Sequence, residues 1–251
     1  MPPRKPRPGP KASGPKAALV APLTAPAKPA RSRRPKPVDR EMVAEIFRRF
    51  RDANPEPRGE LEHTDPYTLL VAVVLSAQAT DAGVNKATRE LFRVADRPDK
   101  MVALGEDGVR EHIRTLNFLN TKARNVVALS HRLVEEHGGV VPPIRAVLES
   151  LPGVGGKSAS VVLNMAFGEP TIAVDTHIFR VASRIPLVRA DAPLETQAKL
   201  ERIVPPEFRL LAHHWLILHG RYVCKARRPE CWRCLIRDLC RYEPKTPAPA
   251  S

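Results

Sequence analysis

All four cysteines of the chain lie in one short segment near its C-terminal end, at Cys224, Cys231, Cys234 and Cys240. Their spacing is C-x6-C-x2-C-x5-C, and four thiols gathered so closely, with none elsewhere, indicate a metal site. Zinc is more often held by two C-x2-C pairs. One such pair with two wider arms suits the larger footprint of a cubane iron–sulfur cluster. The spacing therefore favours an iron–sulfur cluster, with zinc or disulfides as the alternatives.

A glycine-rich segment, Leu-Pro-Gly-Val-Gly-Gly-Lys at 151–157, separates two apolar stretches. Gly153 and Gly155 allow a tight turn and let bare backbone approach a ligand closely. The amides that open the next helix, together with its dipole, favour an anion such as one phosphate of a nucleic-acid backbone. A plain helix–helix turn has a similar composition and is the alternative. The segment is not a Walker phosphate loop, because the glycine and lysine spacing differs.

Lys157 ends this segment, and Asp175 directly precedes another predicted helix. The positive end of a helix dipole disfavours the ammonium form of a lysine, which helps to produce the neutral amine that a nucleophile requires. The two residues are therefore a candidate catalytic pair of amine and carboxylate. Each also has a plainer interpretation, because most lysines are solvated and an aspartate before a helix is commonly an N-cap.

The charge of the chain indicates a polyanionic partner. Lys and Arg number 41 against 27 Asp and Glu, a net charge of +14 with a pI near 10.2, and nucleic acid is the usual partner of such a chain. The loop between the first two cysteines contributes Lys225, Arg227 and Arg228. These side chains could contact a phosphate backbone, or they could form a solvated charged surface.

Residues 1–37 contain ten basic residues, no acidic residue and 11 of the 27 prolines. Such a segment cannot bury a core, so the sequence predicts a disordered basic, proline-rich arm. A targeting peptide is the alternative, although the prolines interrupt the amphipathic helix that such peptides need. Residues 244–251 are predicted to form a flexible tail.

The remainder of the chain is predicted to be all-α. No alternating strand pattern occurs, and the apolar content of 43% is enough for a core and excludes full disorder. No apolar run approaches the roughly 18 residues needed to cross a bilayer. Gly138, Gly139 and Gly168 stand where helix ends favour positive φ. The predicted helices cover residues 39–50, 69–75, 82–94, 108–115, 121–136, 144–150, 156–167, 176–184, 194–203 and 207–223.

Several motifs in order resemble those of the endonuclease III family, which comprises DNA glycosylases and abasic-site lyases of the helix-hairpin-helix superfamily. The resemblance extends from about Met42 to Tyr242. It is carried by the four cysteines together with Leu-Ser-Ala-Gln-Ala-Thr-Asp at 75–81, the glycine-rich segment at 151–157, Val-Asp-Thr-His-Ile-Phe-Arg at 174–180 and His-His-Trp-Leu-Ile-Leu-His-Gly-Arg at 213–221.

The resemblance implies a two-lobed helical fold with a [4Fe–4S] cluster held by the four cysteines. One lobe is a six-helix barrel, here residues 59–169. The other joins residues 38–58 to residues 170–243 and carries the cluster. DNA would bind across the cleft between the lobes, with the damaged nucleotide flipped into it.

The resemblance also assigns roles to residues. Lys157 is the expected nucleophile and Asp175 its carboxylate partner, while Gln78 and Phe118 lie where the family inserts side chains into the DNA stack. The expected activity is excision of oxidised pyrimidines in base excision repair, followed by β-elimination through a Lys157 Schiff base. The expected partner is double-stranded DNA with damaged pyrimidines or abasic sites. The protein is expected to be a monomer in the bacterial cytoplasm, associated with the nucleoid and not with a membrane.

Departures from the family pattern occur at three places. Asn117-Phe118 stands where Gly-Leu is usual, Gly156 where a basic residue is usual, and Ser160 where Asn is usual. Two alternatives remain. An adenine-specific mismatch glycosylase shares the cysteine spacing but lacks the lysine and has a Glu where Val73 stands. A non-catalytic helix-hairpin-helix DNA-binding protein with a structural zinc would not need the pair of Lys157 and Asp175.

Overall fold

The computed structural model describes residues 39–249, so the predicted basic arm of residues 1–37 lies outside the described residues. Every regular element within 39–249 is helical, which confirms the all-α prediction. Residues 244–249 contain no regular secondary structure. The elements are α1 (Arg40–Ala53), α2 (Pro66–Leu75), α3 (Asp81–Val94), α4 (Pro98–His112), α5 (Leu119–His137), α6 (Arg145–Ser150), α7 (Gly156–Phe167), α8 (Thr176–Arg184), α9 (Pro193–Ile203), α10 (Pro206–Tyr222) and the 3₁₀ turn η1 (Cys231–Arg233).

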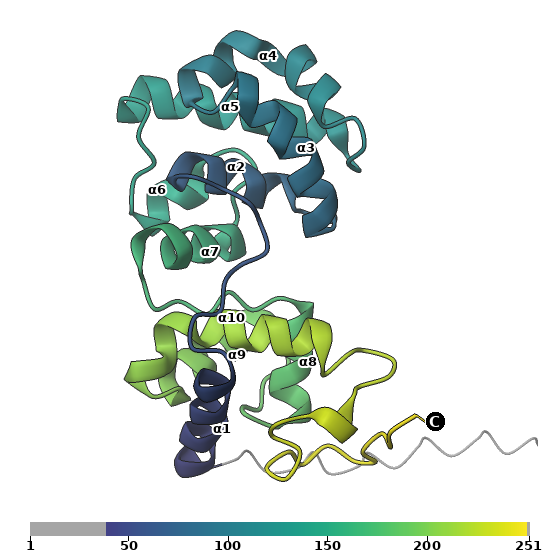
Figure 1. Cartoon of the computed structure of the whole chain (residues 1–251). Helices are drawn as coiled ribbons and strands as arrows, with labels where there is room; N and C mark the ends of the chain where they lie inside the picture. The colour runs from purple at the N-terminus through teal and green to yellow at the C-terminus, as the bar shows by residue number, and fades with distance from the viewer. Residues whose placement is uncertain (1–38, 250–251) are drawn as a thin grey trace, which may run out of the picture. The chain divides into compact units, whose positions relative to one another are not determined.

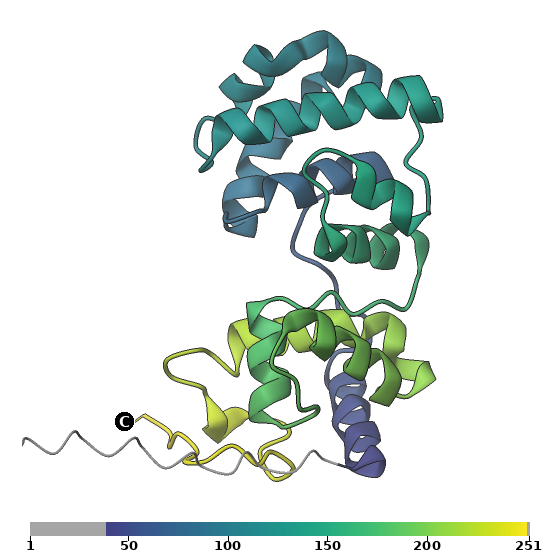
Figure 2. The ribbon, with the colours of Figure 1, turned by 180° about the vertical axis from the view of Figure 1, so that it is seen from behind.

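The helices form two groups, each around its own buried apolar cluster (Figures 1 and 2). Helices α2 to α7 surround one cluster, and we call this group the first lobe. Helices α1, α8, α9 and α10 surround the other together with the cysteine segment, and we call this group the second lobe. The N-terminal helix α1 therefore packs with the C-terminal helices. The chain passes between the lobes twice, before α2 and after α7 (Figure 2).

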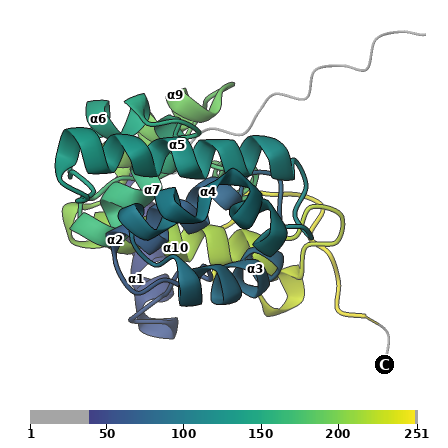
Figure 3. The same ribbon diagram turned by 90° about the horizontal axis from the view of Figure 1, so that it is seen from above.

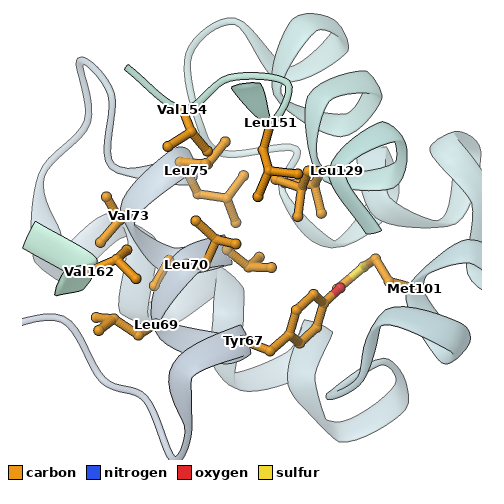
Figure 4. Close-up of a cluster of buried hydrophobic side chains, with 14 of the residues drawn as sticks. Tyr67, Leu69, Leu70, Val73, Leu75, Met101, Leu129, Leu151, Val154 and Val162 are labelled. Atoms are coloured by element: carbon orange, nitrogen blue, oxygen red, sulfur yellow. The ribbon is translucent and has the colours of Figure 1, made fainter. Parts of the chain in front are cut away.

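Helix α2 is the centre of the first lobe. Its ten residues are almost entirely apolar, and it packs against α3, α5 and α7. Asp65 caps its N-terminus, accepting hydrogen bonds from the amides of Tyr67 (2.8 Å) and Thr68 (3.0 Å). Side chains of α2 such as Leu70 belong to one buried cluster with Leu129 and Val162 of neighbouring helices (Figure 4). Truncating such a buried leucine to alanine typically costs about 2–5 kcal/mol of stability. Seen from above, α5 lies beside α4, and both are at the end of this lobe nearest the viewer (Figure 3).

Helix α10 has the same central role in the second lobe, where it packs against α8 and α1. Aromatic side chains join α1 to α10: the rings of Phe47 and Phe208 are stacked with their centroids 6.1 Å apart, and Trp215 lies at 6.3 Å from Phe47. The indole nitrogen of Trp215 donates a hydrogen bond to the carbonyl of Asn54 (2.8 Å) at the end of α1. This contact fixes the start of the first chain crossing against α10.

Polar contacts from α10 join the two lobes. The side-chain amide of Asn164, on α7, donates to the carbonyl of Leu210 on α10 (2.9 Å). Arg221, near the end of α10, donates hydrogen bonds to Glu60 in the first crossing and to Asp81 at the start of α3. Arg221, Glu60 and Asp81 also line a cleft between the lobes.

The helix predictions differ from the structure mainly at α4. The sequence predicted a helix over 108–115, whereas α4 begins at Pro98 and is interrupted at Gly105, where φ is +70°. The first half was missed because it contributes few core residues, chiefly Met101, so its apolar period is weak. Gly138 and Gly168 cap α5 and α7 with φ of +60° and +69°, which confirms the predicted helix ends.

Candidate active site

The cleft between the lobes has a volume of about 320 Å³. Side chains of both lobes line it, because α7 and the turn after α2 come from the first lobe, whereas α8 and α10 come from the second. Its lining includes Lys157, Asp175 and Gln78, which are far apart in the sequence. The buried imidazoles of His213 and His214 and the guanidinium of Arg221 also line it.

Lys157 is placed by the turn between α6 and α7. It is exposed and is the second residue of α7, so it lies at the positive end of that helix dipole as the sequence predicted. No side chain caps the N-terminus of α7, which leaves its first amides available to an external acceptor. The turn itself depends on Gly153, which has φ of +79° and packs against Asn125. Gly155 is exposed and extended, and a Cβ there would meet open space.

Asp175 is the N-cap of α8. Its Oδ1 accepts a hydrogen bond from the amide of Ile178 (2.8 Å), so the plainer interpretation of this residue is correct. The same carboxylate also lines the cleft with Lys157. A cap with one oxygen bonded to backbone is held rigidly, since the hydrogen bond fixes its rotamer. Asp175 can therefore cap α8 and line the cleft at the same time.

Sequence reasoning assigned no role to two cleft residues, His213 and His214. They are 5% and 7% exposed, their rings meet edge to face with centroids 5.4 Å apart, and Nδ1 of each has no hydrogen-bond partner within residues 39–249. Burial lowers the pKa of both, and that of His213 falls to about 3. Both imidazoles are therefore neutral near pH 7. The available signal was the pair of histidines inside the otherwise apolar stretch 210–218 of α10.

Gln78 and Phe118 share an unusual backbone. Within residues 39–249 they are the only non-glycine residues with positive φ, at +53° and +58°. That conformation costs about 1–2 kcal/mol for a residue with a Cβ, and strain of this kind is often found at functional sites. Both side chains are exposed, Phe118 by 60%. Gln78 lines the cleft, and Phe118 lies outside the set of residues that do.

Gly156 and Ser160, two positions that depart from the family pattern, have the same neighbouring side chain. Arg145, at the start of α6, donates from Nη1 to Ser160 Oγ (3.0 Å) and pairs with Glu149 (3.2 Å). The same nitrogen lies 3.5 Å from the carbonyl oxygen of Gly156. The guanidinium of Arg145 on α6 therefore supplies a positive charge beside the hairpin, where Gly156 has no side chain.

The four cysteines line a single pocket with His219, Ile236 and other mostly apolar neighbours. All four are free thiols, so disulfides are absent within this segment. Burial raises the pKa of Cys234 to about 11 and raises that of Cys240 as well. Thiolates in such surroundings need a cation close by. No three Cys, His, Asp or Glu side chains within residues 39–249 converge on a single ion-sized point.

Hydrogen-bond donors point toward the sulfurs. Arg184 Nη1 lies 3.6 Å from Cys224 Sγ, and the Tyr242 amide lies 3.5 Å from Cys240 Sγ. Donors of this kind tune and stabilise cysteine-bound iron–sulfur clusters. The donor set and its burial therefore fit a multi-iron cluster.

The basic residues in the loop after Cys224 differ in whether an acidic side chain pairs with them. Lys225 Nζ pairs with Glu230 (2.6 Å) within the loop. Arg227 and Arg228 are exposed at its tip. Arg184, on α8, holds the loop by donating hydrogen bonds to the carbonyls of Lys225 (2.6 Å) and Ala226 (2.7 Å).

A helical hairpin beside a cleft with a lysine, followed by a four-cysteine segment, defines a class of DNA repair proteins. Residues 71–206 match the HhH-GPD superfamily of base excision DNA repair proteins. Residues 224–240 match the iron–sulfur binding domain of endonuclease III. The protein is thus a helix-hairpin-helix repair enzyme, and its cofactor is a [4Fe–4S] cluster in the cysteine segment.

Relatives that match most of the chain show which family within this class it belongs to. Endonuclease III of Treponema pallidum is 55% identical over 203 residues, 81% of this chain and 96% of the relative. Endonuclease III of Escherichia coli is 53% identical over 80% of this chain and 95% of its own length. A solved structure of a trapped endonuclease III–DNA covalent intermediate is 40% identical, with a TM-score of 0.76 over 81% of this chain and 96% of that one.

The chain belongs to the endonuclease III family. It is a bifunctional DNA glycosylase and abasic-site lyase that acts on oxidised pyrimidines in damaged DNA during base excision repair. A thermostable thymine-DNA glycosylase, 22% identical with a TM-score of 0.69, shares the fold. Among residues 39–249, no helix is both long and apolar enough to traverse a membrane.

Proposed function

We propose that Lys157 is the nucleophile of base excision and Asp175 its carboxylate partner. The observation that carries this proposal is their presence in the lining of one cleft, at the N-termini of α7 and α8. A lysine at a helix N-terminus and a carboxylate held by a backbone hydrogen bond supply the amine and the base that the reaction needs.

The chemistry follows from these two groups. The Lys157 amine attacks C1′ of the deoxyribose, the bond from C1′ to the damaged base breaks, and the base leaves with the bonding electrons. Asp175 accepts a proton from the amine or stabilises positive charge on the sugar. The sugar ring opens to a Schiff base, which acidifies the C2′ proton. Loss of that proton expels the 3′ phosphate by β-elimination, and hydrolysis frees Lys157.

DNA is held at the hairpin and at the two strained residues. The uncapped amides of α7, reached over Gly153 and Gly155, bind one backbone phosphate. Gln78 and Phe118 enter the base stack and occupy the space of the flipped nucleotide. Their positive φ supports this role, because both side chains are exposed and backbone strain of this kind is often found at functional sites.

The four cysteines at 224, 231, 234 and 240 hold the [4Fe–4S] cluster. Bound there, the cluster would cross-link the cysteines and supply a redox-active group. Neither excision nor elimination consumes an electron, so its role would be architectural or redox-sensing. Arg227 and Arg228, with Lys225 once its pair with Glu230 opens, contact the phosphate backbone beside the hairpin.

The two apolar clusters support the division into a barrel lobe at 59–169 and a cluster lobe at 38–58 with 170–243. The substrate is double-stranded DNA with a damaged pyrimidine or an abasic site. The protein works as a monomer, since one chain supplies both walls of the cleft. We place it with the nucleoid in the cytoplasm of a bacterium, as expected of an enzyme with this substrate and bacterial relatives.

The test is borohydride trapping on duplex DNA containing thymine glycol. Lys157→Ala should abolish the covalent complex and strand cleavage while retaining binding to lesion-free duplex. Lys199→Ala is the matched control, because Lys199 pairs with Glu195 on α9 and does not line the cleft. A Lys157→Ala variant that cross-links as well as the control would place the nucleophile elsewhere.

A further inference from the structure

Arg221 is a cleft residue that the proposed reaction does not use. It lies near the end of α10, and its side chain is only 25% exposed. Its guanidinium donates hydrogen bonds to two carboxylates outside the second lobe, those of Glu60 and Asp81, which are 32% and 18% exposed. A charge that is partly removed from water is costly once its partner is lost, so these three groups are held together.

Asp81 connects this contact to Gln78. Asp81 is the first residue of α3 and directly follows the turn of residues 76–80 that joins α2 to α3. Gln78 lies in that turn with φ of +53°, and its side chain lines the same cleft as Arg221. A residue with a strained backbone keeps its conformation only where surrounding contacts impose it. The bond from Arg221 to Asp81 is such a contact, since it ties the end of the turn to α10.

Glu60 extends the same bridge to the first crossing between the lobes. Its carboxylate accepts hydrogen bonds from Arg221 and from the hydroxyl of Tyr222. Its carbonyl oxygen accepts a hydrogen bond from the side-chain amide of Asn85 on α3 (2.8 Å), and the Asn85 side chain accepts one from the amide of Glu62 (3.0 Å). Two adjacent residues of α10 are therefore bonded to a segment that is itself bonded to α3.

A separate contact joins the lobes nearer the start of α10. The side chain of Asn164, on the helix that carries Lys157, donates to the carbonyl of Leu210 (2.9 Å). Leu210 and Arg221 lie about 16 Å apart along the axis of α10. Loss of the Arg221 bridge is therefore expected to displace the turn that carries Gln78, while Asn164 keeps the helix of Lys157 against α10.

We propose that Arg221 is a positioning residue for nucleotide flipping: through Asp81 it holds the turn that carries Gln78 at the place where Gln78 enters the base stack. This inference rests on the proposed insertion of Gln78. A displacement of about 1 Å in a group that acts on the substrate can cost about 10²-fold in rate. The cost should fall on a paired lesion, which must be flipped out of the duplex, and should spare a lesion that is already unpaired.

The experiment is single-turnover excision of thymine glycol by the full chain, from a paired duplex and from the same duplex with the lesion in an unpaired bubble. The ratio of the paired rate to the unpaired rate reports flipping, and both rates come from one preparation of enzyme. Gln78→Ala should lower this ratio by about tenfold or more. Arg221→Lys keeps the charge but loses the planar fork that bridges two carboxylates, and it should lower the ratio by about 10- to 100-fold. In the Gln78→Ala background the same change should cost less than about threefold.

Three further variants test the route through Asp81. Asp81→Ala leaves Arg221 intact and removes its partner, so it should lower the ratio as Arg221→Lys does. Asp81→Asn keeps an oxygen that can accept from Arg221, and its ratio should stay within about threefold of the native value. Arg89→Lys is the matched control, because Arg89 on α3 pairs with Glu62 in the same crossing (2.7 Å) and that pair involves no residue of α10. It should leave the ratio unchanged.

The outcomes separate the two proposals. If Gln78→Ala keeps the native ratio, the proposed insertion fails and Arg221 has nothing to position. If Gln78→Ala lowers the ratio but Arg221→Lys does not, the proposed function stands and the inference is overturned. It is also overturned if Arg221→Lys costs the same factor in both backgrounds, or if Asp81→Ala keeps the native ratio, since Arg221 would then act by another route. Equal losses in Arg221→Lys and Asp81→Ala that vanish without Gln78 support it.

Discussion

Gly153 and Gly155 of the hairpin differ in what an added methyl group would meet. Gly153 has φ of +79°, and a Cβ there would lie 2.8 Å from the side-chain amide nitrogen of Asn125 and 3.0 Å from its Cβ. Gly155 has φ of −102°, and a Cβ there would meet nothing within 4 Å. We therefore expect Gly153→Ala to destabilise the hairpin. Gly155→Ala should leave the fold intact and obstruct only the approach of DNA.

The magnitude follows from the geometry. A left-handed backbone costs about 1–2 kcal/mol for a residue with a Cβ, and displacing Asn125 adds about 1 kcal/mol through local overpacking. The sum of about 2–3 kcal/mol corresponds to a melting temperature about 4–12 °C lower for a protein of this size. Gly155→Ala has neither contribution, so its stability should change by less than about 0.5 kcal/mol.

The assay pairs thermal melting with fluorescence anisotropy on lesion-free duplex DNA. Both variants should bind more weakly, because each disturbs the path of a phosphate to the α7 amides. Loss of one charge-assisted hydrogen bond of about 1.5 kcal/mol would weaken binding about tenfold. Adding Asn125→Ala to Gly153→Ala should recover the overpacking share of the stability, while the backbone share remains.

Two results would refute this reasoning. Equal losses of stability in the two alanine variants would mean that the left-handed turn at Gly153 is not required. Native DNA affinity in Gly155→Ala would mean that the hairpin amides do not meet the phosphate.

Four further outcomes can be checked. The folded-state pKa of His213 lies below its unfolded value, so the neutral form stabilises the fold above pH 6.5. That contribution diminishes as the pH falls towards 3. The free energy of unfolding, measured in urea, should therefore fall by up to about 1.4 kcal/mol per pH unit more in the native protein than in His213→Gln. Cys234→Ser should lower iron content, measured by elemental analysis, and melt the second lobe at a lower temperature, because metal binding is coupled to folding; zinc in place of iron in the native protein would contradict this. Phe118→Ala should slow excision from a paired lesion and spare excision from a single-stranded one, and equal slowing would argue against insertion into the stack. Deleting residues 1–37 should flatten the slope of log K against log salt on lesion-free duplex by about 0.9 for each phosphate that the arm neutralises, and identical slopes would mean that the arm does not engage the backbone.

The sequence by itself determined the features that depend on local chemistry. Helix ends followed from caps and glycines, so Asp39 starts a helix and Gly168 stops one where the pattern indicated. Lys157 occupies the first turn of α7 because the hairpin fixes that boundary within a few residues. The iron–sulfur segment was readable because all four thiols lie within 17 residues of chain. Chelation by neighbours in sequence requires no knowledge of the rest of the fold.

Only the tertiary structure decided which distant groups meet. Lys157, Asp175 and His213 share a cleft because two lobes with separate cores face each other across it, and no local period reports that arrangement. The neutral state of His213 likewise depends on burial by elements far along the chain. Gln78 and Phe118 adopt positive φ although nothing in their own residue types favours it, since the surrounding packing outweighs a cost of about 1–2 kcal/mol. Burial, charge state and backbone strain are properties of the assembled core, and so they lay beyond what the order of residues could give.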